Sequence, residues 1–211
     1  GIAHEAAHDA MSDVNATLAM TARVREAQPR LFSYLFGLRR KADVAAMVYP
    51  LGKQLLVHVS SMYPTERCGA ALVVPLCQHP ENPNGIICYD LSVDPSTLVA
   101  SSAEEVRRLV FTSRVDLLPG EERIPLKVLH LNRCPAIAPL KTLDAASAQR
   151  LGLEAEQAQA HLRQLQQVAG IVPKVQAAYS GRSFEPVADP DLMLYAGDFL
   201  NDDDRLRCNQ V

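Results

Sequence analysis

Hydrophobic residues recur at helical spacing in the first part of the chain. Residues 9–27 contain no proline or glycine, and Val14 and Leu18 lie one turn apart, which predicts one amphipathic helix. Pro29 ends this helix, because proline disfavours helical geometry in the residue before it. A second, shorter helix is predicted over residues 31–38, and it runs into a cluster of basic residues.

The middle of the chain consists of short apolar runs rich in Val, Ile and Leu. Proline, asparagine and glycine separate these runs, which is typical of strands joined by tight turns. The predicted strands cover residues 54–60, 70–76, 85–91 and 126–133. Short strands of this kind predict a small barrel or sandwich. A helix over residues 103–112 interrupts them, because Ser102 and Glu105 form a capping-box pattern at its start.

After Pro135 the chain is predicted to turn helical. Asp144 can cap a helix that ends at Gly152, and residues 154–168 predict a further helix rich in Gln and Ala. Residues 180–191 carry proline and glycine and predict a linker. The whole pattern predicts an α+β protein.

Composition narrows the class of protein. The chain has 211 residues, of which 48% are hydrophobic and 21% charged, as in globular proteins. No apolar run has the length of a bilayer span, and no signal peptide is evident, so we expect a cytoplasmic protein without a membrane partner. The five cysteines are never spaced as C-x-x-C, which argues against a disulfide framework or a zinc knuckle. A net charge of −3 means that any nucleic acid must bind at a local basic patch.

Two motifs share His8. The string HEAAH at residues 4–8 fits H-E-x-x-H, in which two imidazoles bind zinc and the glutamate acts as general base of a peptidase. Only three residues precede the string here, and Asp9 follows it, so the sheet that such a site requires is not encoded before it. A zinc metallopeptidase remains an alternative.

The second motif pairs His8 with Asp13 at an H-x-x-x-x-D spacing. That arrangement suits phosphodiester hydrolysis, where a carboxylate holds Mg²⁺ and a mobile imidazole deprotonates the attacking water. The same residues also fit a helix N-terminus whose acidic side chains complement the helix dipole. Spacing alone leaves both interpretations open.

Several longer strings carry a resemblance. They are AHDAMSDV at residues 7–14, QPRLFSYLF at 28–36, LVHVS at 56–60, HPEN at 79–82 and PLKVLHLNRCP at 125–135. In this order they closely resemble the bacterial exonuclease I family, and the resemblance covers nearly the whole chain. Family members are Mg²⁺-dependent exonucleases that degrade single-stranded DNA from the 3′ end, release mononucleotides and act in DNA repair and recombination.

The resemblance implies both domains and catalytic roles. It implies that residues 1–28 are the end of an RNase H-like exonuclease domain, 29–180 an SH3-like barrel domain with helices, and 181–211 a linker and the start of a helical domain. The sequence pattern itself predicts a last helix from Asp202. His8 matches the general-base histidine and Asp13 the last metal-binding aspartate. The other metal-binding acids belong to earlier motifs that this sequence lacks, so we expect a piece of a longer enzyme that is inactive alone, because one carboxylate cannot hold two metal ions.

The resemblance also points to DNA-binding positions. Matching residues with suitable chemistry are Lys41, Asn84, Lys127, Asn132 and Tyr34. Each also has a plain structural interpretation, as a solvated lysine, a turn-forming asparagine or a packed tyrosine. Alternation along the strand at residues 126–133 is expected to place His130 and Asn132 on one face.

Partners follow from the same resemblance. Single-stranded DNA and the acidic C-terminal tail of single-stranded DNA-binding protein are the implied partners. The apolar surface that a missing domain would cover favours a non-native homo-oligomer. A module that binds single-stranded DNA or protein without catalysis is the second functional interpretation. His58 is expected to be structural, and His79 to organise the turn after it.

Overall fold

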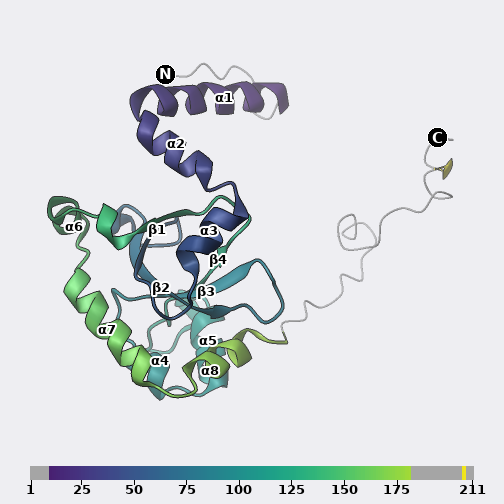
Figure 1. Ribbon diagram of the computed structural model, residues 1–211. Coiled ribbons are helices and arrows are strands. Elements are labelled where there is room, and N and C mark those ends of the chain that lie inside the picture. Colours follow the sequence, from purple (N-terminus) through teal and green to yellow (C-terminus); the bar gives the residue numbers. More distant parts are fainter. Residues whose placement is uncertain (1–9, 182–205, 208–211) are drawn as a thin grey trace. The chain divides into compact units, whose positions relative to one another are not determined.

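A computed structural model describes residues 10–181 and 206–207 of the chain, and Figure 1 shows its arrangement. The predicted first helix is α1 (Ala10–Ala27), and the second is α2 (Pro29–Gly37). Gln28 between them leaves helical geometry, with φ −138° and ψ 65°. Pro29 then occupies the first turn of α2, where its missing N–H has no helical partner to lose. One proline therefore ends one helix and begins the next.

Five antiparallel strands form a single sheet in the order β4-β3-β2-β1-β5. They are β1 (Leu56–Val59), β2 (Ala70–Gln78), β3 (Gly85–Asp90), β4 (Leu126–His130) and β5 (Ala136–Pro139). The first four confirm the predicted strands. The prediction of helix directly after Pro135 is wrong, because β5 pairs there with β1 at the sheet edge. Edge strands tolerate the prolines that disguise this segment.

The prediction for the end of β4 is also wrong. The strand stops at His130, and Asn132 lies in the following turn rather than on the strand face that His130 occupies. The Leu131 N–H donates to the carbonyl of Asn84 (2.8 Å), outside the regular ladder. Cys134 then adopts a left-handed conformation (φ 45°) as the chain turns into β5.

Apolar side chains are buried on both faces of the central strands. Eight of the nine residues of β2 are buried, and all six of β3. On one face Leu72, Val74 and Tyr89 belong to a cluster completed by helices α5, α7 and α8, which Figure 1 shows on that side of the sheet. On the other face a smaller cluster includes Val44 and Val48 of α3 (Lys41–Val48), a helix that the sequence pattern did not predict.

The remaining helices follow their capping signals. In α5 (Ala103–Phe111) Glu105 N–H donates to Ser102 Oγ (3.2 Å), and Ser102 N–H donates to Glu105 Oε2 (2.7 Å), which confirms the capping box. Asp144 caps the helix that follows it, and Gly152 ends that helix with φ 60°, as predicted. The other elements are α4 (Ser96–Ala100), α6 (Ala145–Leu151), α7 (Ala155–Gln167) and α8 (Ile171–Tyr179), with short 3-10 turns η1 (Thr65–Arg67), η2 (Arg114–Asp116) and η3 (Leu140–Thr142).

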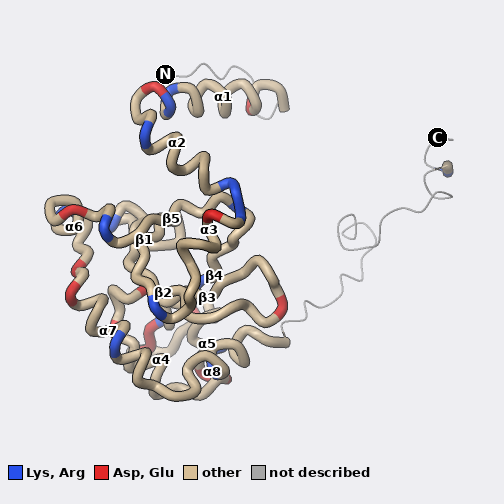
Figure 2. Tube along the Cα trace, in the orientation of Figure 1, with Lys and Arg blue, Asp and Glu red and all other residues tan. Residues whose placement is uncertain are grey.

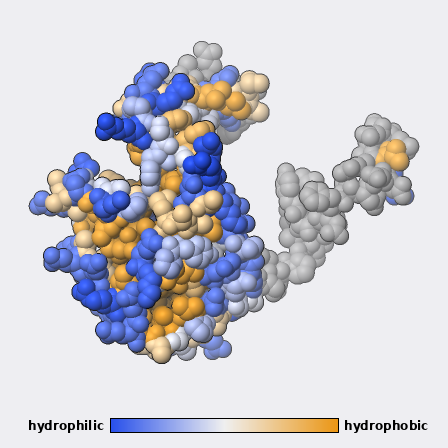
Figure 3. Space-filling model, in the orientation of Figure 1, coloured by the Kyte–Doolittle hydropathy of each residue, from blue (hydrophilic) through white to orange (hydrophobic). Residues whose placement is uncertain are grey.

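Helix α1 differs from the others in its burial. None of its residues, 10–27, is buried within the described structure, and its large apolar side chains lie at the surface, as Figure 3 shows. These exposed side chains are Met11, Val14, Leu18, Met20 and Val24. Among the described helices, none has the length and apolarity needed to cross a membrane. Asp202, where a last helix is predicted to start, lies outside the described residues. Leu206 and Arg207, which are described, are helical.

Candidate nucleic-acid interface

Three of the predicted DNA-binding residues meet at one end of the sheet. Lys41 Nζ donates to Asn84 Oδ1 (2.6 Å). The Asn84 carbonyl accepts the Leu131 N–H (2.8 Å), and the exposed Asn132 follows directly. We call Lys41, Asn84 and Asn132 the polar corner. Figure 2 shows basic residues at the bend between α2 and α3, where Lys41 begins α3.

The turn between β2 and β3 fixes the polar corner. Its backbone N–H groups of Glu81 and Asn82 donate to His79 Nδ1 (3.1 and 3.2 Å), which confirms the organising role predicted for this histidine. Asn82 Oδ1 in turn accepts the Asn84 N–H (3.0 Å). A side chain at Gly85 would bring its Cβ within 3.0 Å of the His79 side chain, so glycine lets the turn close. The backbone of Asn84 is therefore held by the hydrogen-bonded turn, and its side chain by Lys41.

His130 lies beside this turn, with its Nδ1 3.5 Å from Asn82 Nδ2. Burial lowers the pKa of His130, and the charges of Arg133 and His79 lower it further. A lowered pKa keeps the imidazole neutral at pH 7. The positive charge at the polar corner therefore comes from Lys41 and not from His130.

Tyr34 is placed elsewhere, on α2. Its hydroxyl donates to the Ile137 carbonyl of β5 (2.8 Å), and burial raises the pKa of this hydroxyl. The residue keeps 38% of its surface exposed. Tyr34 therefore anchors α2 to the sheet edge while one part of its ring remains accessible.

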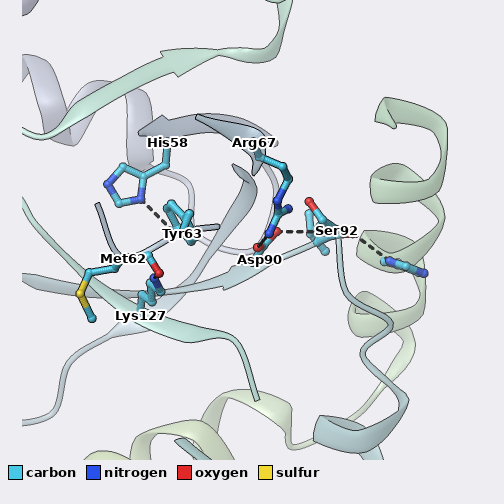
Figure 4. Close-up of polar contacts among 9 residues, drawn as sticks. His58, Met62, Tyr63, Arg67, Asp90, Ser92 and Lys127 are labelled. Atoms are coloured by element: carbon cyan, nitrogen blue, oxygen red, sulfur yellow. Dashed lines mark hydrogen bonds and ion pairs between the residues drawn. The ribbon is translucent and has the colours of Figure 1, made fainter. Parts of the chain in front are cut away.

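Lys127 is not part of the polar corner. It lies on β4 three residues before His130, or about 10 Å along the strand. Its ammonium donates to the Met62 carbonyl and lies 4.0 Å from the centroid of the Tyr63 ring, as Figure 4 shows. Burial lowers the pKa of Lys127 to about 8, Asp90 opposes that shift, and nearby arginines add to it.

His58 contacts Tyr63, the aromatic ring beside Lys127. Its Nδ1 is 3.0 Å from the Tyr63 hydroxyl, and its side chain is buried. Burial and the charge of Lys127 lower the pKa of His58 to about 4. A neutral, buried and hydrogen-bonded imidazole has a structural role, as predicted.

Sequence reasoning missed a buried ion pair beside Lys127. Arg67 Nη2 and Asp90 Oδ2 lie 3.0 Å apart, with only 16% and 3% of the two side chains exposed. The partners come from η1 and from the end of β3, and no local motif links them. Only the pairing of β1 with β2 and of β2 with β3 brings them together.

The predicted catalytic residues are only partly described. His8 and the whole HEAAH string lie outside the described residues, whereas Asp13 lies in the first turn of α1. Within residues 10–181 and 206–207, no group of three or more His, Cys, Asp or Glu side chains is arranged to hold a metal ion. The described residues therefore do not fit a metal centre by themselves.

Known proteins are similar to this chain in sequence and in fold. Residues 39–181 match the family described as the exonuclease I SH3-like domain. Exodeoxyribonuclease I of Escherichia coli (strain K12) is 38% identical over 206 residues, which are 97% of this chain and 43% of that protein. Exodeoxyribonuclease I of Haemophilus influenzae is 39% identical over 96% of this chain and 43% of that protein. The chain thus spans less than half the length of these relatives.

Solved structures agree with the sequence comparison. Exonuclease I of Methylocaldum szegediense is similar with a TM-score of 0.80 and 42% identity, over 97% of this chain and 42% of that chain. A zinc-bound complex of E. coli exonuclease I with single-stranded DNA is similar with a TM-score of 0.84 and 38% identity, over 100% of this chain and 44% of that chain. The α+β fold with an SH3-like domain is therefore confirmed, and the chain belongs to the exonuclease I family.

Proposed function

We propose that this chain forms one wall of the groove along which a 3′-to-5′ exodeoxyribonuclease holds single-stranded DNA. The observation that carries the proposal is the contact between Lys41 and Asn84 beside Asn132. The E. coli relative has been solved in complex with single-stranded DNA, which supports the same ligand class here. Lys41 is exposed, so a phosphate can approach its ammonium from solvent.

The chemistry of the polar corner favours contacts to phosphate and sugar. An ammonium and two side-chain amides donate hydrogen bonds to backbone oxygens without reading base edges. Such contacts suit an enzyme that moves along a strand of any sequence. Lys127 remains a predicted contact, although a strand would have to compete with the Met62 carbonyl for its ammonium.

Hydrolysis belongs, in this proposal, to the longer protein. His8 would act as general base and Asp13 as one of several Mg²⁺ ligands, and the release of mononucleotides would serve DNA repair in the cytoplasm. Two-metal hydrolysis requires several carboxylates, and the described residues offer no such cluster. We therefore propose that the 211-residue chain alone does not cleave DNA.

Domain limits and partners complete the proposal. We assign residues 1–28 to the exonuclease domain, 29–180 to the SH3-like domain and 181–211 to a linker and the start of a helical domain. The acidic tail of single-stranded DNA-binding protein is the proposed protein partner. The exposed apolar side chains of α1 support self-association of the isolated chain.

The test is binding of a fluorescent oligo-dT to the 211-residue chain, with and without Mg²⁺. We expect binding without metal, and we expect Lys41→Gln to weaken it about tenfold and to reduce the salt slope by about 0.7, as loss of one phosphate contact to a single strand does. Asn132→Ala should weaken binding less, since it removes a neutral donor. Lys141→Gln, at an exposed lysine outside the polar corner, is the matched control.

Two outcomes would contradict this proposal. Equal weakening by Lys41→Gln and Lys141→Gln would show that the polar corner has no special part in binding. Release of mononucleotides by the purified chain with Mg²⁺ would show that it carries a complete catalytic centre.

A further inference from the structure

A cleft of about 770 Å³ opens beside Lys127. Its walls come from η1, the end of α5, η2 and β4, and they include Tyr63 and Lys127, shown in Figure 4. Apolar side chains line one part of it, namely Val93, Val110, Phe111, Leu117, Ile124 and Tyr179. The volume lies within the range of small-molecule sites, about 300–1,000 Å³.

Positive charge dominates the polar part of the cleft. The lining contains Arg67, Arg114, Arg123 and Lys127. It also contains three carboxylates, but Asp90 pairs with Arg67 at 3.0 Å. Glu121 binds both terminal nitrogens of Arg108 (2.8 and 2.5 Å), and Glu122 is exposed. The cations therefore exceed the carboxylates left to neutralise them.

The lowered pKa of Lys127 reflects the same excess of positive charge. After burial, the charges of Arg123, Arg114 and Arg67 lower its pKa, and the single opposing influence is Asp90. Arg108, by hydrogen bonding, keeps the pKa of Glu121 near 2, so Glu121 stays ionised and paired. An anion placed among these groups would relieve their mutual repulsion.

Arg67 offers a further donor. Its Nη2 is bound to Asp90, whereas its Nη1 is buried and has no hydrogen-bond acceptor within the part of the chain that the structure describes. A buried guanidinium nitrogen without an acceptor is costly. The cleft thus combines surplus cations with an apolar wall, and Arg67 in its lining keeps one buried nitrogen without an acceptor among the described residues.

We infer that this cleft binds a free nucleoside 5′-monophosphate, with the phosphate among Arg67, Arg114 and Arg123 and the base against the apolar wall. A phosphomonoester carries about two negative charges at pH 7, against one for each phosphodiester of a strand, and so matches the surplus cations better. The inference rests on the proposed function in one respect, because exonucleolytic cleavage would release this class of molecule. The cleft would then be a product site outside the polar corner.

Titration calorimetry of the 211-residue chain tests this with dAMP, deoxyadenosine and inorganic phosphate. We expect dAMP to bind at one site, and the two partial ligands to bind at least about tenfold more weakly, since each lacks half of the contacts. Arg114→Gln and Arg123→Gln should each weaken dAMP about tenfold through loss of a charge-assisted hydrogen bond. Arg163→Gln, at an exposed arginine of α7 outside the cleft, should leave it unchanged.

Arg123 also donates to the Val110 carbonyl, so the melting temperature of each variant is measured to confirm that it is folded. Absence of dAMP binding, or equal weakening by Arg163→Gln, would overturn the inference. So would a loss of oligo-dT binding in the Arg114 variant equal to its loss of dAMP binding, because the phosphate-binding arginines would then belong to the strand path. Failure of the polar corner is distinguishable, because it removes oligo-dT binding while dAMP still binds.

Discussion

Helices α1 and α5 are both predicted from local sequence signals, α1 from apolar residues at helical spacing and α5 from the capping-box pattern of Ser102 and Glu105, yet they relate differently to the rest of the structure. Helix α5 buries Val106, Leu109 and Val110 in the cluster on one face of the sheet. Helix α1 is twice as long, and none of its residues is buried in the described structure. Most of the stability of a helix in a protein comes from packing of its apolar face, and α1 draws little of that packing from the described structure. Local sequence signals predict that a helix forms, but they do not predict which surface covers its apolar side chains.

Truncation of matched leucines gives the largest expected contrast. Leu109 of α5 is 7% exposed, whereas Leu18 of α1 is 62% exposed. We expect Leu109→Ala to lower the free energy of unfolding by about 2–5 kcal/mol, and Leu18→Ala to change it by less than about 0.5 kcal/mol. Urea unfolding measures both values. Similar losses at the two positions would show that α1 contributes to the same cooperative unit as α5.

Acid should destabilise the sheet through His58. Its pKa in the folded protein is about 4, below the ordinary 6.5, so between these pH values the unfolded chain binds more protons than the folded one. The stability contributed by the neutral imidazole is complete above about pH 6.5, and about 2–3 kcal/mol of it should be lost as the pH falls to 4. In His58→Gln this part of the pH dependence should disappear. Urea unfolding of the unchanged protein and of His58→Gln at several pH values measures this. Parallel plots of unfolding free energy against pH for the two proteins would contradict the prediction.

Local hydrogen bonds between side chain and backbone give the smallest contrast. Ser102→Ala removes the capping box of α5 and should cost about 1 kcal/mol. In α1, Thr17 Oγ1 donates to the Asp13 carbonyl (2.8 Å), and Thr17→Ala should have an effect within about 0.5 kcal/mol, because alanine is the better helix former. Urea unfolding of both variants measures the effect, and we expect the midpoint of Ser102→Ala to fall further than that of Thr17→Ala. A larger loss of stability in Thr17→Ala would contradict this expectation.

Local signals in the sequence predicted most of the elements. Ser102 and Glu105 marked the start of α5, and Asp144 and Gly152 the limits of α6, because capping depends on residues within one turn. The first four strands were predicted because β-branched runs between turn residues are local patterns as well. Strand β5 was missed, since four residues that end in Pro139 acquire strand geometry only by pairing with β1.

The candidate site was predicted less completely. The resemblance named Lys41 and Asn84, but their contact spans 43 positions of sequence and depends on how α3 packs against the sheet. Asn132 was assigned to a strand because the alternation continues past His130, whereas the ladder ends there. The arginines of the cleft come from separate turns, and nothing local links them.

The position of β1 between β2 and β5 has a consequence for how the protein is made. Residues 56–59 pair on one side with 70–73 and on the other with 136–139. During synthesis one edge of β1 keeps its backbone N–H and C=O groups unpaired until the ribosome has added all the intervening residues and β5 itself. Long-range pairing of this kind slows folding, and an open flank invites pairing between nascent chains. The slow closing step, and with it the need for chaperone protection, should therefore coincide with the emergence of β5.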